Sequence, residues 1–133
     1  MAGSMIDKKK MGRNSRIRGK RFENEVYDWL SEQGYVVTRW TNTIIDGKIV
    51  PQKPKYNPFL KRIMSSQTGF PDYLAFISRG GGYVFPMGIE CKSGQPYLDK
   101  KEREMVQAYK EKHTFDKIMV ACKKDGKIML KGV

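Results

Sequence analysis

The chain has few of the residues that build disulfide scaffolds, cysteine-based metal sites or membrane spans. Its 133 residues include only two cysteines and one histidine. Two cysteines are too few for a disulfide scaffold or a zinc site. Because Cys91 and Cys122 both fall in apolar, strand-like stretches, we expect buried, reduced thiols.

Long apolar stretches are absent as well. No run approaches the ~20 residues that a membrane span needs. The N-terminus is polar and cationic, without the apolar segment of a signal peptide. We therefore expect an intracellular protein, located in the cytoplasm or, for a viral protein, the host cytoplasm. We expect no membrane partner and no small-molecule cofactor.

Acidic residues are scarce relative to basic ones. The chain holds 26 lysines and arginines against 14 aspartates and glutamates, which gives a formal net charge of +12. This excess indicates a polyanionic partner, and nucleic acid is the usual one. A purely structural nucleic-acid binder would show the same excess, so charge alone does not separate an enzyme from a binding protein.

The length suits one domain. Residues 1–4 are typical of a cloning remnant, and residues 5–18 are cationic with little periodicity. We expect residues 1–18 to form this remnant and a flexible basic arm, and residues 19–133 to form a single domain.

Periodicity predicts an α/β fold, with a mixed β-sheet flanked by helices. In the first helix, Phe22, Val26 and Leu30 form one apolar face, and Gly34 ends it. The predicted helices cover residues 19–33 and 98–112. The predicted strands cover residues 35–40, 72–78, 83–91, 117–122 and 127–130, with a glycine turn at 79–82.

Residues 41–71 form an unusual basic stretch. An Asp-Gly turn signal within residues 44–50 predicts a small hairpin. Pro51, Pro54 and Pro58 then argue against regular structure. Because Tyr56 and Phe59 lie among lysines, the loop could follow a nucleic-acid backbone and stack on bases. A plain surface insertion is the alternative.

The chemistry concentrates in Pro71-Asp72 and Glu90-Cys91-Lys92. Asp72 opens one predicted strand and Glu90 ends the next, so both carboxylates lie at one end of a hairpin. Strand alternation places Glu90 and Lys92 on the same face. Two carboxylates and the Cys91 carbonyl suit Mg²⁺, with Mn²⁺ as a substitute. Lys92 could orient or deprotonate water and stabilise phosphorane charge. The alternative is a solvated Glu–Lys pair and a turn aspartate.

These motifs resemble those of the PD-(D/E)XK nuclease superfamily, which implies a restriction-endonuclease-like core. The resemblance also implies a helix glutamate near the metal, for which Glu23 and Glu25 are candidates. Within the superfamily, the chain is most similar to the archaeal-type Holliday-junction resolvases. The likeness rests on Arg18-Gly19-Lys20-Arg21-Phe22-Glu23 and on the stretch from Gly34 to Arg39.

The resemblance implies a homodimeric, Mg²⁺-dependent endonuclease that resolves four-way DNA junctions. Its implied catalytic residues are Glu23, Asp72, Glu90 and Lys92, and its implied metal ligands are Glu23, Asp72, Glu90 and the Cys91 carbonyl. The candidate DNA contacts are Arg16, Arg18, Lys20, Arg21, Lys53, Lys55, Lys61, Arg62, Ser65 and Ser66.

The chain departs from the resolvases in its longer 41–71 loop, and no dimer surface is recognisable in the sequence. Two alternatives stay open. A restriction-like or virus-type replication-repair nuclease would act on flaps, ends or duplex, and Gln107 matches the helix glutamine of the virus type. A non-catalytic nucleic-acid-binding protein belongs to another class and would have no use for acids facing the phosphates.

Overall fold

The computed structural model describes residues 4–53, 56–63, 69–78, 80–82 and 84–133, with the side chains of 4–11 and 13 left out. Lys55, Ser65 and Ser66, three of the candidate DNA contacts, lie outside these residues. In the described part of the chain, no helix combines the length and apolarity required to cross a membrane.

The core of the fold is a five-stranded mixed sheet with the strand order β1-β6-β7-β8-β9. Its central pair, β7 and β8, is parallel, and every other neighbouring pair is antiparallel. The parallel pair needs a crossover connection, and the second helix lies within that connection. The strands are β1 Val36–Arg39, β6 Tyr73–Phe76, β7 Met87–Cys91, β8 Lys117–Lys124 and β9 Lys127–Gly132.

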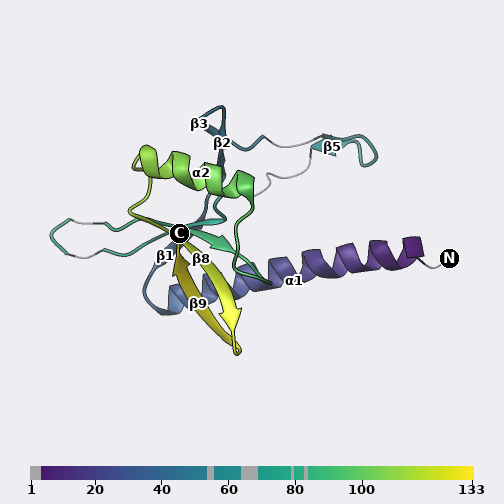
Figure 1. Cartoon of the computed structure of the whole chain (residues 1–133), viewed down its shortest axis with the longest axis horizontal. Coiled ribbons are helices and arrows are strands. Elements are labelled where there is room, and N and C mark those ends of the chain that lie inside the picture. The colour runs from purple at the N-terminus through teal and green to yellow at the C-terminus, as the bar shows by residue number, and fades with distance from the viewer. Residues whose placement is uncertain (1–3, 54–55, 64–68, 79, 83) are drawn as a thin grey trace.

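The two helices cover opposite faces of this sheet (Figure 1). Helix α1 (Ser4–Glu32) packs Phe22, Val26 and Leu30 against one face. Helix α2 (Lys100–Glu111) packs Met105 and Tyr109 against the other. The predicted α/β class, mixed sheet and apolar face of the first helix are therefore confirmed.

Helix α1 is longer than the sequence indicated. Residues 5–18, which the sequence suggested as a flexible arm, belong to α1, which runs continuously from Ser4 and extends well beyond the sheet (Figure 1). The packed half of the helix supplies a nucleus, and each added residue then gains one backbone hydrogen bond. The segment is also rich in lysine, arginine and methionine, which are good helix formers.

The 41–71 stretch holds two small antiparallel ribbons. The first joins β2 (Asn42–Ile45) to β3 (Lys48–Pro51). Its turn residues Asp46 and Gly47 have positive φ angles of 51° and 74°, as the Asp-Gly signal predicted. The second ribbon joins β4 (Tyr56–Asn57) to β5 (Arg62–Ile63). Pro51 ends a strand and Pro58 lies in the turn between β4 and β5, so, contrary to the expectation, these two prolines do not exclude regular structure, and Pro54 lies outside the described residues.

The segment before Asp72 is held by the first ribbon and by α2. The Gly69 amide donates to the Trp40 carbonyl at 2.9 Å, and the Phe70 amide donates to the Asn42 carbonyl at 2.9 Å. The Tyr109 hydroxyl donates to the Phe70 carbonyl at 2.6 Å. A Cβ on Gly69 would lie only 2.0 Å from the Asn42 oxygen, so glycine is required. These contacts fix the backbone that presents Asp72.

Gly88 generates a stability prediction, because a Cβ there would lie 2.8 Å from Pro71 Cγ and 3.3 Å from the Phe115 ring. We expect Gly88→Ala to lower the free energy of unfolding by about 1–3 kcal/mol, as overpacking in a core does. Urea unfolding measures this change. The matched control is Gly132→Ala, because its Cβ would meet only Met119 Sδ at 3.8 Å. Equal stability of the Gly88→Ala variant and the wild type would contradict the prediction.

Candidate active site

Asp72 and Glu90 lie opposite each other on neighbouring strands. The β6–β7 register pairs Tyr73 with Ile89, so Asp72, one residue earlier, is placed opposite Glu90. Ile89 packs in the α1 cluster, so alternation turns Glu90 toward the face that α2 covers. The Cys91 amide donates to Asp72 Oδ2 at 2.8 Å, which ties the two strand ends together. The predicted convergence of the two carboxylates is confirmed.

Both carboxylates are buried, with only 9% of Asp72 and 7% of Glu90 exposed. Burial raises the pKa of Glu90 far above its ordinary value of 4.5, and the hydrogen bond and charge of Asp72 raise it further. Two like charges in a buried site destabilise each other. In the absence of a compensating cation, the folded protein therefore favours a proton on Glu90.

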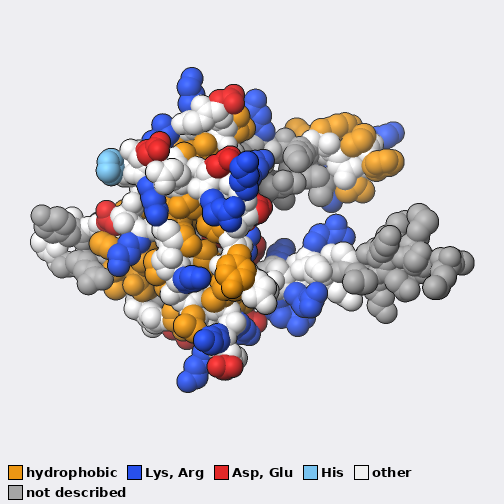
Figure 2. Space-filling view, in the orientation of Figure 1, with side chains coloured by type: hydrophobic (Ala, Val, Ile, Leu, Met, Phe, Trp, Pro, Cys, Tyr) orange, Lys and Arg blue, Asp and Glu red, His pale blue; other side chains and the backbone are white. Residues whose placement is uncertain are grey.

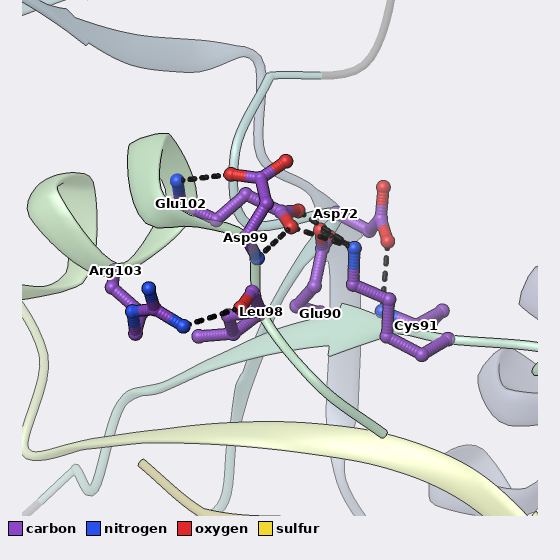
Figure 3. A network of polar contacts seen from close by, with 8 residues as sticks. Asp72, Glu90, Cys91, Leu98, Asp99, Glu102 and Arg103 are labelled. Carbon is purple, nitrogen blue, oxygen red and sulfur yellow. Dashed lines mark hydrogen bonds and ion pairs between the residues drawn. The ribbon is translucent and has the colours of Figure 1, made fainter. Parts of the chain in front are cut away.

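Lys92 is held in the same site by Glu102 of α2. Its ammonium donates to both carboxylate oxygens of Glu102 at 2.8 Å and lies 3.9 Å from Glu90 Oε2 (Figure 3). Burial alone would lower the pKa of Lys92, but the hydrogen bond to Glu102 and the charge of Glu90 outweigh it, and the pKa is raised. Lys92 therefore stays a cation at neutral pH. As a cation it can stabilise nearby negative charge, but it cannot accept a proton.

Glu102 is itself fixed by the start of α2. Its amide donates to Asp99 Oδ1 at 2.7 Å, and the Asp99 amide donates to Glu102 Oε1 at 3.0 Å, which completes a capping box. Burial would raise the pKa of Glu102, but the Lys92 and Asp99 hydrogen bonds outweigh it, and the pKa is lowered. Glu102 thus stays ionised and orients Lys92 from a rigid helix end.

Glu23 lies near this site, and Glu25 does not. The pKa of Glu23 is raised by burial and by the Asp72 charge, while Arg39 and Lys20 oppose the shift. Glu25 instead pairs with Lys123 of β8 at 2.6 Å. Within the described residues, no three acidic, histidine or cysteine side chains gather closely enough to hold a metal. The structure therefore brings Asp72 and Glu90 together and leaves Glu23 as their electrostatic neighbour.

Cys91 packs against the α1 cluster, on the face opposite Glu90 as strand alternation predicted, but its thiol also lies beside the Asp72 carboxylate. Burial and the Asp72 charge raise the pKa of its thiol well above the ordinary value. Both cysteines are free thiols, as expected; Cys122 is buried, whereas Cys91 is only partly buried. The Cys91 side chain is therefore a protonated, partly buried thiol next to Asp72.

The basic candidates among the described residues are exposed. Lys and Arg side chains lie along the visible face of the described part of α1 (Figure 2), and Arg16, Arg18, Lys20 and Arg21 are all exposed. A groove of about 320 Å³ lies between α1 and the segment that follows Lys92. Arg18, Arg21, Ser93 and Gly94 line it together with the ion pair of Lys123 and Glu25. Lys53, Lys61 and Arg62 are exposed on the 41–71 stretch, away from this groove.

Sequence reasoning missed Glu102. The signal that could have found it is the capping-box pattern Asp99-x-x-Glu102 shortly after Glu90-x-Lys92. Gln107, the glutamine of the virus-type alternative, is exposed and donates to Glu111 at 3.3 Å. The α2 position that faces Lys92 belongs to Glu102 instead.

Comparisons of the chain with protein-family models, with curated proteins and with solved structures return no match. The chemistry of the site is therefore interpreted from its own geometry: two buried carboxylates, one fixed ammonium and an adjacent basic groove.

The raised pKa of Glu90 predicts how stability changes with pH in protein kept in a metal chelator. Above pH 4.5 the unfolded chain releases the Glu90 proton while the folded chain keeps it, so stability falls as pH rises. Glu90→Gln cannot lose a proton. We expect its stability advantage over the wild type to grow between pH 5 and 8, by at most about 1.4 kcal/mol per pH unit.

Thermal or urea unfolding at several pH values measures this difference. The matched control is Glu104→Gln, an exposed glutamate on α2, which should follow the wild type at every pH. If the free energies of unfolding of Glu90→Gln and the wild type differ by the same amount at every pH, the raised pKa of Glu90 is contradicted.

Proposed function

We propose that this protein is a Mg²⁺-dependent DNA endonuclease that cuts branched DNA, with the four-way junction as its substrate. The observation that carries the proposal is the buried pair of Asp72 and Glu90 beside the fixed Lys92 ammonium. A fold gains no stability from two adjacent buried acids, whereas a site for a hard cation and a phosphate requires them.

The donor set fits Mg²⁺. This ion is commonly bound through one or two carboxylates together with substrate phosphate and water. Asp72 and Glu90 supply the carboxylates, and the Cys91 carbonyl is the third oxygen candidate. When bound, the ion would lower the pKa of a bound water molecule and compensate negative charge on the phosphate. Glu23 would act at longer range, in line with the effect of the Asp72 charge on its pKa.

Lys92 would stabilise the transition state of phosphodiester hydrolysis. As water attacks phosphorus and the bond to the leaving oxygen breaks, negative charge grows on the phosphate oxygens. A permanently charged ammonium at this position lowers the energy of the transition state in which that charge develops. Glu102 holds it at 2.8 Å and so limits the reorganisation that the reaction would otherwise require.

The basic surface would bind the DNA backbone without reading sequence. The exposed cations of α1 and the groove lined by Arg18, Arg21 and Lys123 lie next to the segment that follows Lys92. Phosphate contacts of this kind supply affinity and strong salt dependence. Shape would then select the substrate, as the resemblance to the junction resolvases implies. Two symmetric cuts at a junction need two sites, so we propose a homodimer.

The test compares three DNA substrates of matched sequence in Mg²⁺: a mobile four-way junction, a linear duplex and a single strand. We expect cleavage of the junction, because the proposed site acts on branched DNA. Asp72→Asn and Lys92→Ala should each lower the cleavage rate by about 10²-fold or more. Gel analysis of end-labelled strands measures the rates.

The matched controls change the same kinds of charge at the exposed β8–β9 turn. Asp125→Asn and Lys127→Ala should keep the wild-type rate. Equal cutting of all three substrates would reject junction selectivity. Unimpaired cleavage by Asp72→Asn or Lys92→Ala would reject the site. Tight, salt-sensitive binding without Mg²⁺-dependent cleavage would favour the non-catalytic binder.

A further inference from the structure

The β4–β5 ribbon exposes more apolar surface than its own fold requires. It projects from the body of the molecule (Figure 1), with apolar and basic side chains at its surface (Figure 2). Phe59 at the tip is 93% exposed, and Leu60 beside it is 53% exposed. Tyr56 and Ile63, which pair across the ribbon, are 61% and 68% exposed.

The tip has a defined conformation. Asn57 Oδ1 accepts hydrogen bonds from the Phe59 amide at 2.9 Å and from the Leu60 amide at 3.1 Å. Lys61 then adopts a positive φ of 50°, which closes the turn. Local backbone contacts therefore place Phe59 outward, and no core packing holds it there. An isolated two-stranded ribbon is marginally stable in water, so a binding role explains the exposed side chains better than a folding role does.

The positive charge of the ribbon indicates nucleic acid as its partner. Residues 56–63 contain Lys61 and Arg62 and no acid, and both cations are exposed. Apolar side chains flanked by cations are typical of proteins that insert a wedge between base steps or stack on unpaired bases. A second copy of the chain suits the ribbon less well. Eight residues are far fewer than the 20–30 per side of a stable protein interface, and paired copies would bring like charges together.

We propose that the β4–β5 ribbon is a wedge that stacks Phe59 on an unpaired or unstacked base of branched DNA, with Lys61 and Arg62 on the adjacent phosphates. This inference rests on the proposed function, because branched DNA is the substrate proposed there. The inference specifies which feature of the DNA is recognised: a base at the branch that is not stacked on its neighbours. A linear duplex offers no such base without the cost of unstacking.

The test measures binding rather than cleavage, using fluorescence anisotropy in a metal chelator with a four-way junction and a duplex of the same sequence. Phe59→Ala should weaken junction binding by about 5- to 150-fold, because stacking on one base is lost. Its affinity for duplex should stay unchanged. Phe59→Trp should keep junction affinity, because the indole ring also stacks. The matched control is Ile45→Ala on the β2–β3 ribbon. Ile45 is an apolar residue that is 56% exposed, and its variant should bind both DNAs normally.

A second signal follows the base itself. A 2-aminopurine placed at the branch should change its emission when the wild type binds, and this change should be lost with Phe59→Ala. Unchanged junction binding by Phe59→Ala would overturn the proposal, as would equal losses on junction and duplex. A Phe59→Ala variant that binds the junction normally but no longer self-associates in sedimentation would identify a second copy as the occupant, and would overturn the proposal too.

Failure of this inference differs from failure of the proposed function. Hydrolysis of bis(4-nitrophenyl) phosphate in Mg²⁺ reports on the Asp72 site without any base to stack on. Phe59→Ala should leave this hydrolysis at the wild-type rate. If the wild type cuts no DNA and hydrolyses no ester, yet Phe59→Ala still loses junction affinity, the wedge stands and the nuclease proposal falls. If Phe59→Ala lowers ester hydrolysis as much as junction binding, the wedge is overturned.

Discussion

Repulsion between two buried carboxylates is the constraint on which the rest of this structure depends. Asp72 and Glu90 face each other across β6 and β7 with less than a tenth of either residue exposed. Ionising both there is unfavourable, so the fold must restrain them through other contacts. The Cys91 amide holds Asp72, and the Lys92–Glu102 pair lies beside Glu90. The surrounding sheet, the α2 cap and the glycines at 69 and 88 all maintain an arrangement in which the two carboxyl groups cannot both be ionised without a compensating cation.

Two adjacent buried acids of this kind are typical of a functional site, because a bound cation would attract both carboxylates and allow both to be ionised. Tyr109 extends the restraint through the core: its hydroxyl donates to Phe70, and Trp40 Nε1 donates to that same hydroxyl at 3.1 Å. Asp72 therefore rests on a segment that is fixed by ring packing as well as by hydrogen bonds. Preorganisation of this kind keeps charged groups in place at the moment of reaction.

The sequence alone predicted those features that follow from local periodicity. Alternation along β7 assigned Glu90 and Lys92 to one face and Cys91 to the other, and the spacing of Phe22, Val26 and Leu30 located the packed half of α1. The N-terminal half of α1 was missed because its sequence has no apolar stripe, and its helicity depends on the packed half. Glu102 was missed because its contact with Lys92 is set by tertiary packing. The β4–β5 ribbon was missed because its strands are only two residues long.

The most direct test of the buried pair as a cation site is a titration of the protein with Mn²⁺, followed by electron paramagnetic resonance and competed with Mg²⁺. The account predicts saturable binding to the wild type that Mg²⁺ displaces and that Asp72→Asn abolishes, with Asp125→Asn binding normally. Binding that survives in Asp72→Asn, or a wild type that takes up no Mn²⁺, would contradict it.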